Sequence, residues 1–133
     1  MSRRNHIFAV DEYYHCFNRG TDKRVIFADK QDFTYFLESM KAYNSTQTFG
    51  KLRLHLENIS TEQKIVEIVA FCLLPNHFHL VLKQCADGGI SKFMQRVGIG
   101  YTLYFNEKNE LSGALLEGAF KSKCIVSVRD LTQ

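Results

Sequence analysis

The sequence predicts an α+β fold, in which two helices cover one face of an antiparallel sheet. Two observations predict this class. Segments with the two-residue period of strands and segments with the 3.6-residue period of helices alternate along all 133 residues. No repeat, low-complexity tract or linker interrupts them, and 45% hydrophobic with 23% charged residues is ordinary for one globular domain. We therefore expect residues 1–133 to form a single domain.

The first third of the chain predicts one strand followed by one helix. Residues 10–20, VDEYYHCFNRG, are rich in β-branched and aromatic side chains and end at a glycine, which is typical of a strand. Asp29 is a candidate N-cap, and apolar residues follow it at helical spacing: Phe33, Phe36, Leu37, Met40 and Tyr43. An amphipathic helix is expected after Asp29.

The middle of the chain predicts three strands. Leucines alternate with polar residues over residues 51–57, which indicates a half-buried strand. The segment 64–75 is rich in valine and isoleucine and follows a polar turn, so the two segments are expected to pair as an antiparallel hairpin. Pro75 and Asn76 are turn formers, and residues 77–84, HFHLVLKQ, are expected to return as a further strand.

The last third of the chain predicts a second helix and a final strand. After Gly88 and Gly89, apolar side chains recur at helical spacing at Ile90, Phe93, Met94, Val97, Tyr101, Tyr104 and Phe105. Two glycines within this helix, Gly98 and Gly100, each cost about 1 kcal/mol relative to alanine. Residues 113–127 then predict a last strand.

The order of these elements is strand, helix, hairpin, strand, helix and strand. Two interlocked, split β-α-β halves give this order, which predicts the ferredoxin-like pattern of an antiparallel sheet with both helices on one face. In this topology the first strand, residues 10–20, is expected to lie beside the strand formed by residues 77–84.

Composition excludes several classes of protein. No apolar run approaches the roughly 20 residues that a membrane helix needs, and the N-terminal segment lacks the apolar centre of a secretion signal. We expect a cytoplasmic protein whose four scattered cysteines are reduced, partly buried thiols: Cys16, Cys72, Cys85 and Cys124. The net charge of +3 is too small to indicate a nucleic-acid partner by itself, although the basic surplus flanks the residues discussed next.

Two histidines separated by one residue, His77 and His79, form the candidate site. Because side chains alternate along a strand, both imidazoles share one face and the intervening apolar residues share the other. The apolar residues must face the helices, so the imidazoles are expected on the helix-free face. Neutral imidazole is a good ligand for divalent transition ions. An isolated pair of this kind is more often incidental, and spacing alone gives no third ligand; zinc would need Cys16 or Cys72.

Blocks spread along nearly the whole chain resemble the REP-associated tyrosine transposases, which belong to the single-tyrosine HUH transposases. The HUH motif of that family is a histidine, a hydrophobic residue and a histidine, and His77-Phe78-His79 matches it within the context PNHFHL. The other matching blocks occur in the expected order, at residues 14–27, 32–40, 70–83, 93–106 and 113–122. Two departures are Ala119, where the family's GRFK block carries arginine, and a hairpin around residues 49–66 that resembles an insertion.

The resemblance implies cleavage and rejoining of single-stranded, hairpin-forming DNA, usually by a homodimer. In such enzymes the histidine pair, here His77 and His79, and a third polar ligand hold Mg²⁺ or Mn²⁺ against the scissile phosphate, where the ion acts as a Lewis acid. A tyrosine hydroxyl attacks and forms a 5′-phosphotyrosine, which conserves the energy of the broken bond for rejoining.

The resemblance also raises a question about the nucleophile. The family's tyrosine lies on a helix after the last strand, and no tyrosine follows Tyr104 in this sequence. We expect the nucleophile beyond Gln133, which would leave the 133-residue chain inactive by itself. Ser127 and Asp130 resemble the capping box that begins such a helix. Tyr101 and Tyr104 are alternatives within the chain, although their spacing places them on the apolar stripe of the second helix.

Basic residues near the predicted site are candidates for contacts with DNA: Arg19, Arg24, Lys83, Lys121 and Lys123. Plain solvation explains each of these charges at least as well. His15, on the first strand, is expected to line the site or the core rather than to bind metal. Two other classes stay open: a noncatalytic or domesticated DNA-binding module, and a small metal-binding or hydrolase domain.

Overall fold

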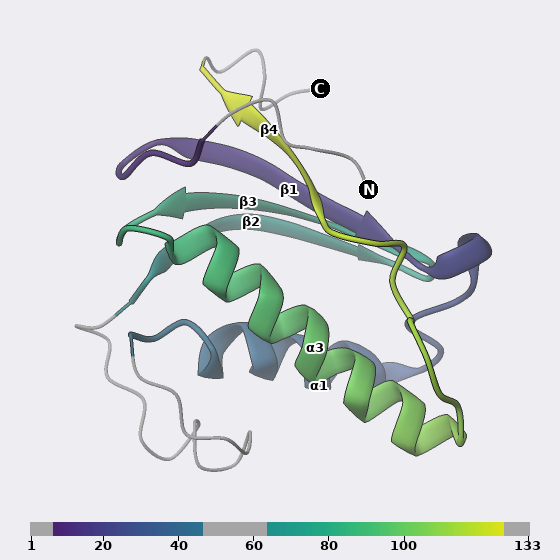
Figure 1. The fold of residues 1–133 in the computed structure, drawn as a ribbon. Helices are drawn as coiled ribbons and strands as arrows, with labels where there is room; N and C mark the ends of the chain where they lie inside the picture. The colour runs from purple at the N-terminus through teal and green to yellow at the C-terminus, as the bar shows by residue number, and fades with distance from the viewer. Residues whose placement is uncertain (1–6, 47–63, 127–133) are drawn as a thin grey trace.

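The computed structural model describes residues 7–46 and 64–126, which form a four-stranded antiparallel sheet with two helices on one side (Figure 1). The elements are β1 (Tyr13–Arg19), a short 3-10 turn (Thr21–Lys23), α1 (Lys30–Ala42), β2 (Val66–Leu74), β3 (His77–Gln84), α3 (Gly89–Asn109) and β4 (Lys121–Ile125). The strand order across the sheet is β2-β3-β1-β4. The predicted α+β class and ferredoxin-like arrangement are confirmed.

Strand β3 lies inside the sheet and is paired on both sides. It runs antiparallel to β2, to which the turn at Pro75 and Asn76 connects it as predicted, and antiparallel to β1. The register of β1 and β3 places Phe17 opposite His79 and Arg19 opposite His77. The first strand therefore neighbours the histidine strand, as the topology predicted, and β4 completes the sheet beyond β1.

The alternation predicted for β3 is observed. Phe78, Leu80 and Leu82 are at most 2% exposed, because they point to the helix side of the sheet. They pack there with apolar side chains of β1, α1 and α3, among them Tyr14, Cys16, Phe36, Met40, Phe93, Val97 and Tyr101. Each fully buried side chain of this kind contributes roughly 1.5–3 kcal/mol. This packing fixes which face of β3 is left for His77 and His79.

Both helices begin where the sequence indicated. Asp29 is the N-cap of α1, since its carboxylate accepts a hydrogen bond from the backbone N–H of Asp32 at 3.1 Å. Helix α3 begins at Gly89, directly after Gly88 in the left-handed region with φ of 70°. A Cβ atom on Gly89 would lie 2.3 Å from the carbonyl oxygen of Ile65, so only glycine fits at this close approach.

The prediction of a last strand over residues 113–127 was too long, because β4 comprises only Lys121–Ile125. Gly113 and Gly118 have φ of 87° and 64°, which interrupts the extended conformation. Between them, Leu115 is fully buried, and Leu116 forms an isolated bridge with Gly20. The segment before β4 is therefore a loop tied to the end of β1.

Some expectations fall outside the residues that the structure describes: the strand at 51–57, most of the hairpin around 49–66, and Ser127, Asp130 and Gln133. The four cysteines are described, and none of them forms a disulfide. Cys16 is buried, but Cys72, Cys85 and Cys124 are exposed, so the expectation of partial burial was wrong for these three. Within the described ranges, neither helix combines the length and apolar character needed to cross a membrane.

Candidate functional site

His77 and His79 lie on the helix-free face of the sheet, half-buried, near the start of β3. Their ring centroids are 5.1 Å apart and the rings are perpendicular. The neighbouring strand β1 contributes His15 and Phe17 to the same face, because its odd-numbered residues point away from the core. The site is therefore built on two paired central strands rather than on a loop.

The imidazole of His77 is held by the residue before it. Its Nδ1 atom lies 2.7 Å from Oδ1 of Asn76. The amide orientation of Asn76 is supported by its Nδ2 group, which donates to the backbone carbonyl of Lys23 at 3.4 Å. Because an amide oxygen only accepts, Nδ1 of His77 carries the proton and donates. The Nε2 atom then keeps its lone pair for a metal ion.

The imidazole of His79 is held across the sheet. Its Nδ1 atom lies 2.9 Å from Nε2 of His15, and the two rings stack with centroids 5.0 Å apart. When Nδ1 of His79 is the donor, its Nε2 atom also keeps a lone pair. His15 thus lines the site, which is one of the two positions expected for it.

The surroundings of His15 and His79 favour the neutral form of both imidazoles. Burial lowers the pKa of His15 below its ordinary value, and the charges of His79 and Lys123 lower it further. Burial also lowers the pKa of His79, with a smaller contribution from His77. Neutral imidazole is the form that binds a metal ion, so the environment favours the state that a metal site requires.

A cavity of about 490 Å³ opens over the two histidines. It is lined by Phe17, Asn18, Arg19, Lys23, Asn76, His77, His79, Glu117 and Lys121. Three of these side chains are cationic and one is a carboxylate. Arg19 and Glu117 form a two-point ion pair, with Nε to Oε2 at 2.7 Å and Nη2 to Oε1 at 3.3 Å. The cavity is therefore suited to an anion beside the imidazoles.

The predicted basic residues occupy different places. Arg19 and Lys121 line the cavity, and Lys123 lies on the same face, opposite His15 in the register of β1 and β4. Lys83 lies at the far end of β3, 3.9 Å from a carboxylate oxygen of Asp11, and does not line the cavity. Arg24 does not line it either.

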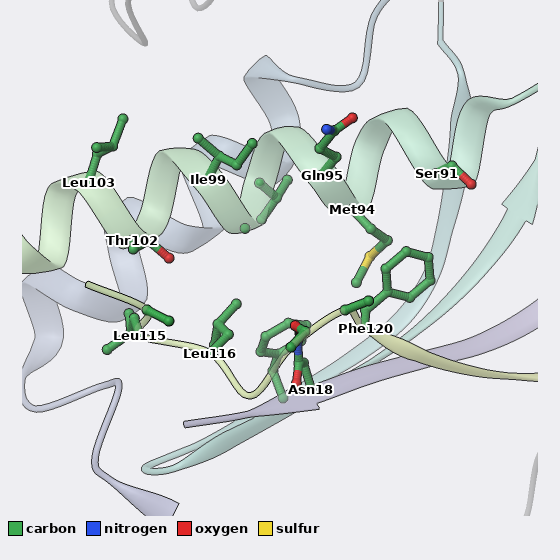
Figure 2. A pocket seen from close by; sticks show the side chains of 16 residues that line it. Asn18, Ser91, Met94, Gln95, Ile99, Thr102, Leu103, Leu115, Leu116 and Phe120 are labelled. Carbon is green, nitrogen blue, oxygen red and sulfur yellow. The ribbon is translucent and has the colours of Figure 1, made fainter. Parts of the chain in front are cut away.

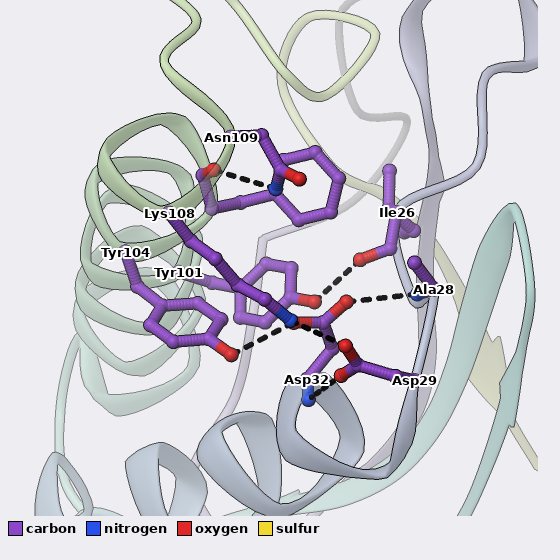
Figure 3. Close-up of polar contacts among 9 residues, drawn as sticks. Ile26, Ala28, Asp29, Asp32, Tyr101, Tyr104, Lys108 and Asn109 are labelled. Carbon is purple, nitrogen blue, oxygen red and sulfur yellow. Dashed lines mark hydrogen bonds and ion pairs between the residues drawn. The ribbon is translucent and has the colours of Figure 1, made fainter.

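The two in-chain tyrosine candidates, Tyr101 and Tyr104, belong to α3 and pack with the core on the helix side of the sheet, whereas the histidines lie on its other face. The Tyr101 hydroxyl donates to the carbonyl of Ile26, and the Tyr104 hydroxyl donates to Asp32 Oδ1 at 2.7 Å (Figure 3). Burial raises the pKa of both hydroxyls, that of Tyr104 to about 12. These tyrosines are structural residues in contacts with α1 and the segment before it.

Within the described residues, no group of three or more histidine, cysteine or acidic side chains is positioned to hold a metal ion. Cys16 cannot join the pair because it faces the core. Cys72 lies opposite His79 on the neighbouring strand β2, but it does not form a three-ligand group with the two histidines. Among the described residues, the candidate metal ligands that lie together are therefore the two imidazoles of His77 and His79.

Sequence reasoning missed several residues of this cavity. Asn76 was interpreted only as a turn former, although its position directly before His77 was a local signal. Lys23 and Glu117 reach the cavity through the turn after β1 and the loop before β4, and no sequence period predicts such contacts. Phe17 follows from the parity of β1, since it shares a face with His15.

A second cavity, of about 640 Å³, lies between α3 and the loop before β4 (Figure 2). Its lining is mostly apolar and includes Met94, Leu116 and Phe120, with Asn18 at its floor. Ala119, the departure from the family's arginine, lines this cavity and not the one over the histidines.

The fold and the site together define a class: a small α+β protein with a histidine pair and cationic side chains on the open face of its sheet. No family model matches the sequence, and no curated protein sequence matches it. Solved structures do match. One is the REP-associated tyrosine transposase bound to a REP hairpin, with a TM-score of 0.62 at 12% identity, over 99% of this chain and 67% of that one.

A second similar structure is a candidate transposase from Deinococcus radiodurans R1, with a TM-score of 0.57 at 11% identity, over 99% of this chain and 91% of that one. Both likenesses extend over the whole chain, so the architecture of these transposases and of this chain is the same. At this level of identity the comparison establishes the fold. The chemistry must be argued from the residues themselves.

Proposed function

We propose that this chain is of the REP-associated tyrosine transposase type, and that its cavity binds a phosphate of single-stranded, hairpin-forming DNA together with Mg²⁺ or Mn²⁺. One observation carries the proposal. His77 and His79 both make a hydrogen-bond contact through Nδ1, which leaves Nε2 for a metal ion when Nδ1 carries the proton, and they lie in a cavity with three cationic side chains. A phosphate and a divalent ion bound side by side need this combination.

Each residue has a role in this proposal. His77 and His79 would hold the ion, which would supply Lewis-acid stabilisation of charge on a non-bridging phosphate oxygen. Arg19 and Lys121 neutralise the phosphodiester and fix the register of the strand. Asn76 and His15 orient the two imidazoles, as second-shell partners of metal-binding histidines do.

The nucleophile is a separate matter. All six tyrosines of the sequence lie within the described ranges, and none of them lines the histidine cavity. We infer that none of these six tyrosines is positioned as the attacking nucleophile of this site. The chain by itself should therefore bind hairpin DNA without forming a covalent protein–DNA link.

The test combines binding and mass spectrometry. A fluorescently labelled single strand with one hairpin should bind the 133-residue chain, and the log–log slope of affinity against salt should be about −0.7 per phosphate neutralised. His77→Ala and His79→Ala should each lower the affinity for Mn²⁺ at least about tenfold. A flat salt response, or unchanged Mn²⁺ binding in both variants, would contradict the proposal. A covalent adduct on Tyr101 or Tyr104 would contradict the inference about the nucleophile.

A noncatalytic DNA-binding module is the second candidate, and the same lack of a tyrosine in the cavity favours it. The two functions differ in their use of metal. A binding module should hold hairpin DNA equally well after His77→Ala and His79→Ala, and without Mg²⁺ or Mn²⁺. Tight metal binding with no affinity for DNA would instead favour a small metal-binding or hydrolase domain. The dimer implied by the resemblance would appear as a doubled mass in sedimentation analysis.

A further inference from the structure

The ion pair of Arg19 and Glu117 lies directly beside the histidine pair. Glu117 is the acidic residue among those that line the cavity over His77 and His79. Its two carboxylate oxygens accept from two nitrogens of the Arg19 guanidinium, at 2.7 and 3.3 Å. The carboxylate of Glu117 therefore shares a cavity with two imidazoles but is paired with Arg19. The proposed function assigns this same arginine to the binding of phosphate.

The backbone holds Glu117 close to the histidines. Its N–H donates to the carbonyl of Arg19 at 2.9 Å, and the buried Asn18 side chain donates to the carbonyl of Gly118 at 3.1 Å. Arg19 is itself the cross-strand partner of His77. Glu117 and His77 therefore flank Arg19 on opposite sides, about 10 Å apart at the spacing of neighbouring strands. The side chains of Glu117 and His77 can both reach one metal ion across this distance when they extend toward each other.

The contact between Arg19 and Glu117 is easily exchanged. Both side chains are substantially exposed, at 46% and 40%. Exposed ion pairs add little to stability, so their separation costs little. The planar guanidinium binds phosphate with the same two-point geometry that it uses for carboxylate, and a DNA phosphate entering the cavity competes for it directly.

We propose that a DNA phosphate takes Arg19 away from Glu117, and that the released carboxylate joins His77 and His79 as a third ligand for the divalent cation. This inference rests on the proposed function. Two imidazoles and one carboxylate form a ligand set that holds a divalent ion and leaves positions open for substrate. As they stand, the described residues contain no such group of three, and both carboxylate oxygens of Glu117 contact Arg19.

One consequence is a coupling between the two ligands of the site. If DNA frees Glu117 for the cation, DNA raises the affinity for the cation, and the cation raises the affinity for DNA by the same factor. The Arg19–Glu117 pair would then keep the metal site incomplete until the substrate arrives.

The experiment measures Mn²⁺ affinity by electron paramagnetic resonance, with and without a single-stranded hairpin oligonucleotide, after subtraction of Mn²⁺ bound by the DNA alone. In the wild-type chain DNA should raise the Mn²⁺ affinity about tenfold or more. Glu117→Gln should abolish this gain, whereas Glu38→Gln, an exposed position on α1, should retain it.

A second arm needs no DNA. Arg19→Gln should raise Mn²⁺ affinity several-fold because it releases Glu117, and adding Glu117→Gln should cancel the rise. Lys121→Gln is the matched control, since it removes a positive charge from the same cavity without releasing the carboxylate. The inference is overturned if Arg19→Gln raises the affinity no more than Lys121→Gln, or if Glu117→Gln keeps the full gain with DNA.

The two proposals fail in different ways. If His77→Ala and His79→Ala leave Mn²⁺ binding unchanged, the proposed metal site itself is wrong. If those variants lose Mn²⁺ while Glu117→Gln behaves as the wild type in both arms, only the role of Glu117 is wrong.

Discussion

The Nε2 atom of His15 lies 2.9 Å from the Nδ1 atom of His79, across the pair of central strands β1 and β3. One proton is shared in this contact, and its position decides whether His79 offers a lone pair at Nε2. If His79 holds a metal ion as proposed, His15, 64 positions away in the sequence, would act as a residue that positions this ligand and not as a ligand itself.

Replacing His15 should test this role. In His15→Phe the Nδ1 group of His79 loses its acceptor, and the affinity for Mn²⁺ should fall about tenfold, as is typical when such a partner is removed. His15→Asn supplies an amide oxygen that can accept the same proton, so it should restore part of the loss. The measurement is a Mn²⁺ titration; equal affinities for the two variants would contradict a positioning role.

His15 and His79 should titrate below the ordinary pH range of histidine. Burial and neighbouring charge lower the pKa of His15 and His79 below the ordinary value of 6.5. As pH falls below 6.5 the unfolded chain takes up protons first, so the folded protein loses stability until its own imidazoles are protonated. Nuclear magnetic resonance of the ring protons should give midpoints below 6.5. In His79→Ala the midpoint of His15 should rise only partly, because burial is the larger cause.

The basic residues should contribute unequally to DNA binding. Lys121 lines the histidine cavity, whereas Lys83 lies at the other end of β3 beside Asp11 and the ring of Tyr13. Lys121→Gln should weaken binding of a hairpin strand and reduce the magnitude of the salt slope by about 0.7. Lys83→Gln should change both quantities much less. Equal losses of affinity in Lys121→Gln and Lys83→Gln would show that the DNA does not bind preferentially at the histidine cavity.

A buried acidic group stabilises the helix side of the sheet. The carboxylate of Asp32 is fully buried and accepts from the N–H of Ala28, the hydroxyl of Tyr104 and the ammonium of Lys108 (Figure 3). Burial by itself would raise the pKa of Asp32, but these hydrogen bonds outweigh burial and hold it below its ordinary value. The carboxylate therefore stays charged in the folded protein.

Removing this carboxylate should lower the free energy of unfolding. Asp32→Ala removes the acceptor of hydrogen bonds from Ala28, Tyr104 and Lys108, whose own groups stay partly accessible to water, and should cost roughly 2 kcal/mol at pH 7 in urea denaturation. The folded pKa lies below the unfolded value of 3.8, so the contribution is complete above that pH and is lost as the pH falls further. The difference in free energy of unfolding between the wild type and Asp32→Ala should accordingly become smaller as the pH falls below 3.8. Asp87→Ala, at an exposed loop position, should have little effect at either pH.

The two glycines inside α3 should respond differently to alanine. A Cβ atom on Gly98 would lie 3.7 Å from Leu116, an ordinary contact, so Gly98→Ala should stabilise the helix by up to about 1 kcal/mol. A Cβ atom on Gly100 would lie 3.1 Å from the ring of Tyr43, which must then shift. Thermal unfolding should give a higher midpoint for Gly98→Ala than for Gly100→Ala.

The sequence predicted the parts of this molecule that depend on local periodicity. The strand at residues 77–84, the capping of α1 by Asp29 and the face on which His77 and His79 lie all follow from alternation and helical spacing. The length of the last strand was overestimated. Its first part contains residues that favour extended backbone, but Gly113 and Gly118 have positive φ, and Leu115 between them is buried.

The candidate site was predictable only in part. Arg19, at the end of the first predicted strand, and Lys121, on the last, were among the predicted DNA contacts. Glu117 was not, because it reaches the cavity through a loop whose path is set by contacts with Asn18 and Gly20. The contact of His15 with His79 depends on the register of two strands that are distant in sequence. Such contacts carry no periodic signal and become visible only when the strands are paired.

The strand order β2-β3-β1-β4 has a consequence for how the site moves. The amides of β3 bond alternately to β1 and to β2, so the strand is held from both sides and its exchange with deuterium should be slow. Lys121 belongs instead to β4, a five-residue strand at the edge of the sheet, where local opening requires less free energy. The imidazoles of His77 and His79 are thus held in a fixed geometry, whereas the neighbouring Lys121 side chain has more freedom to move.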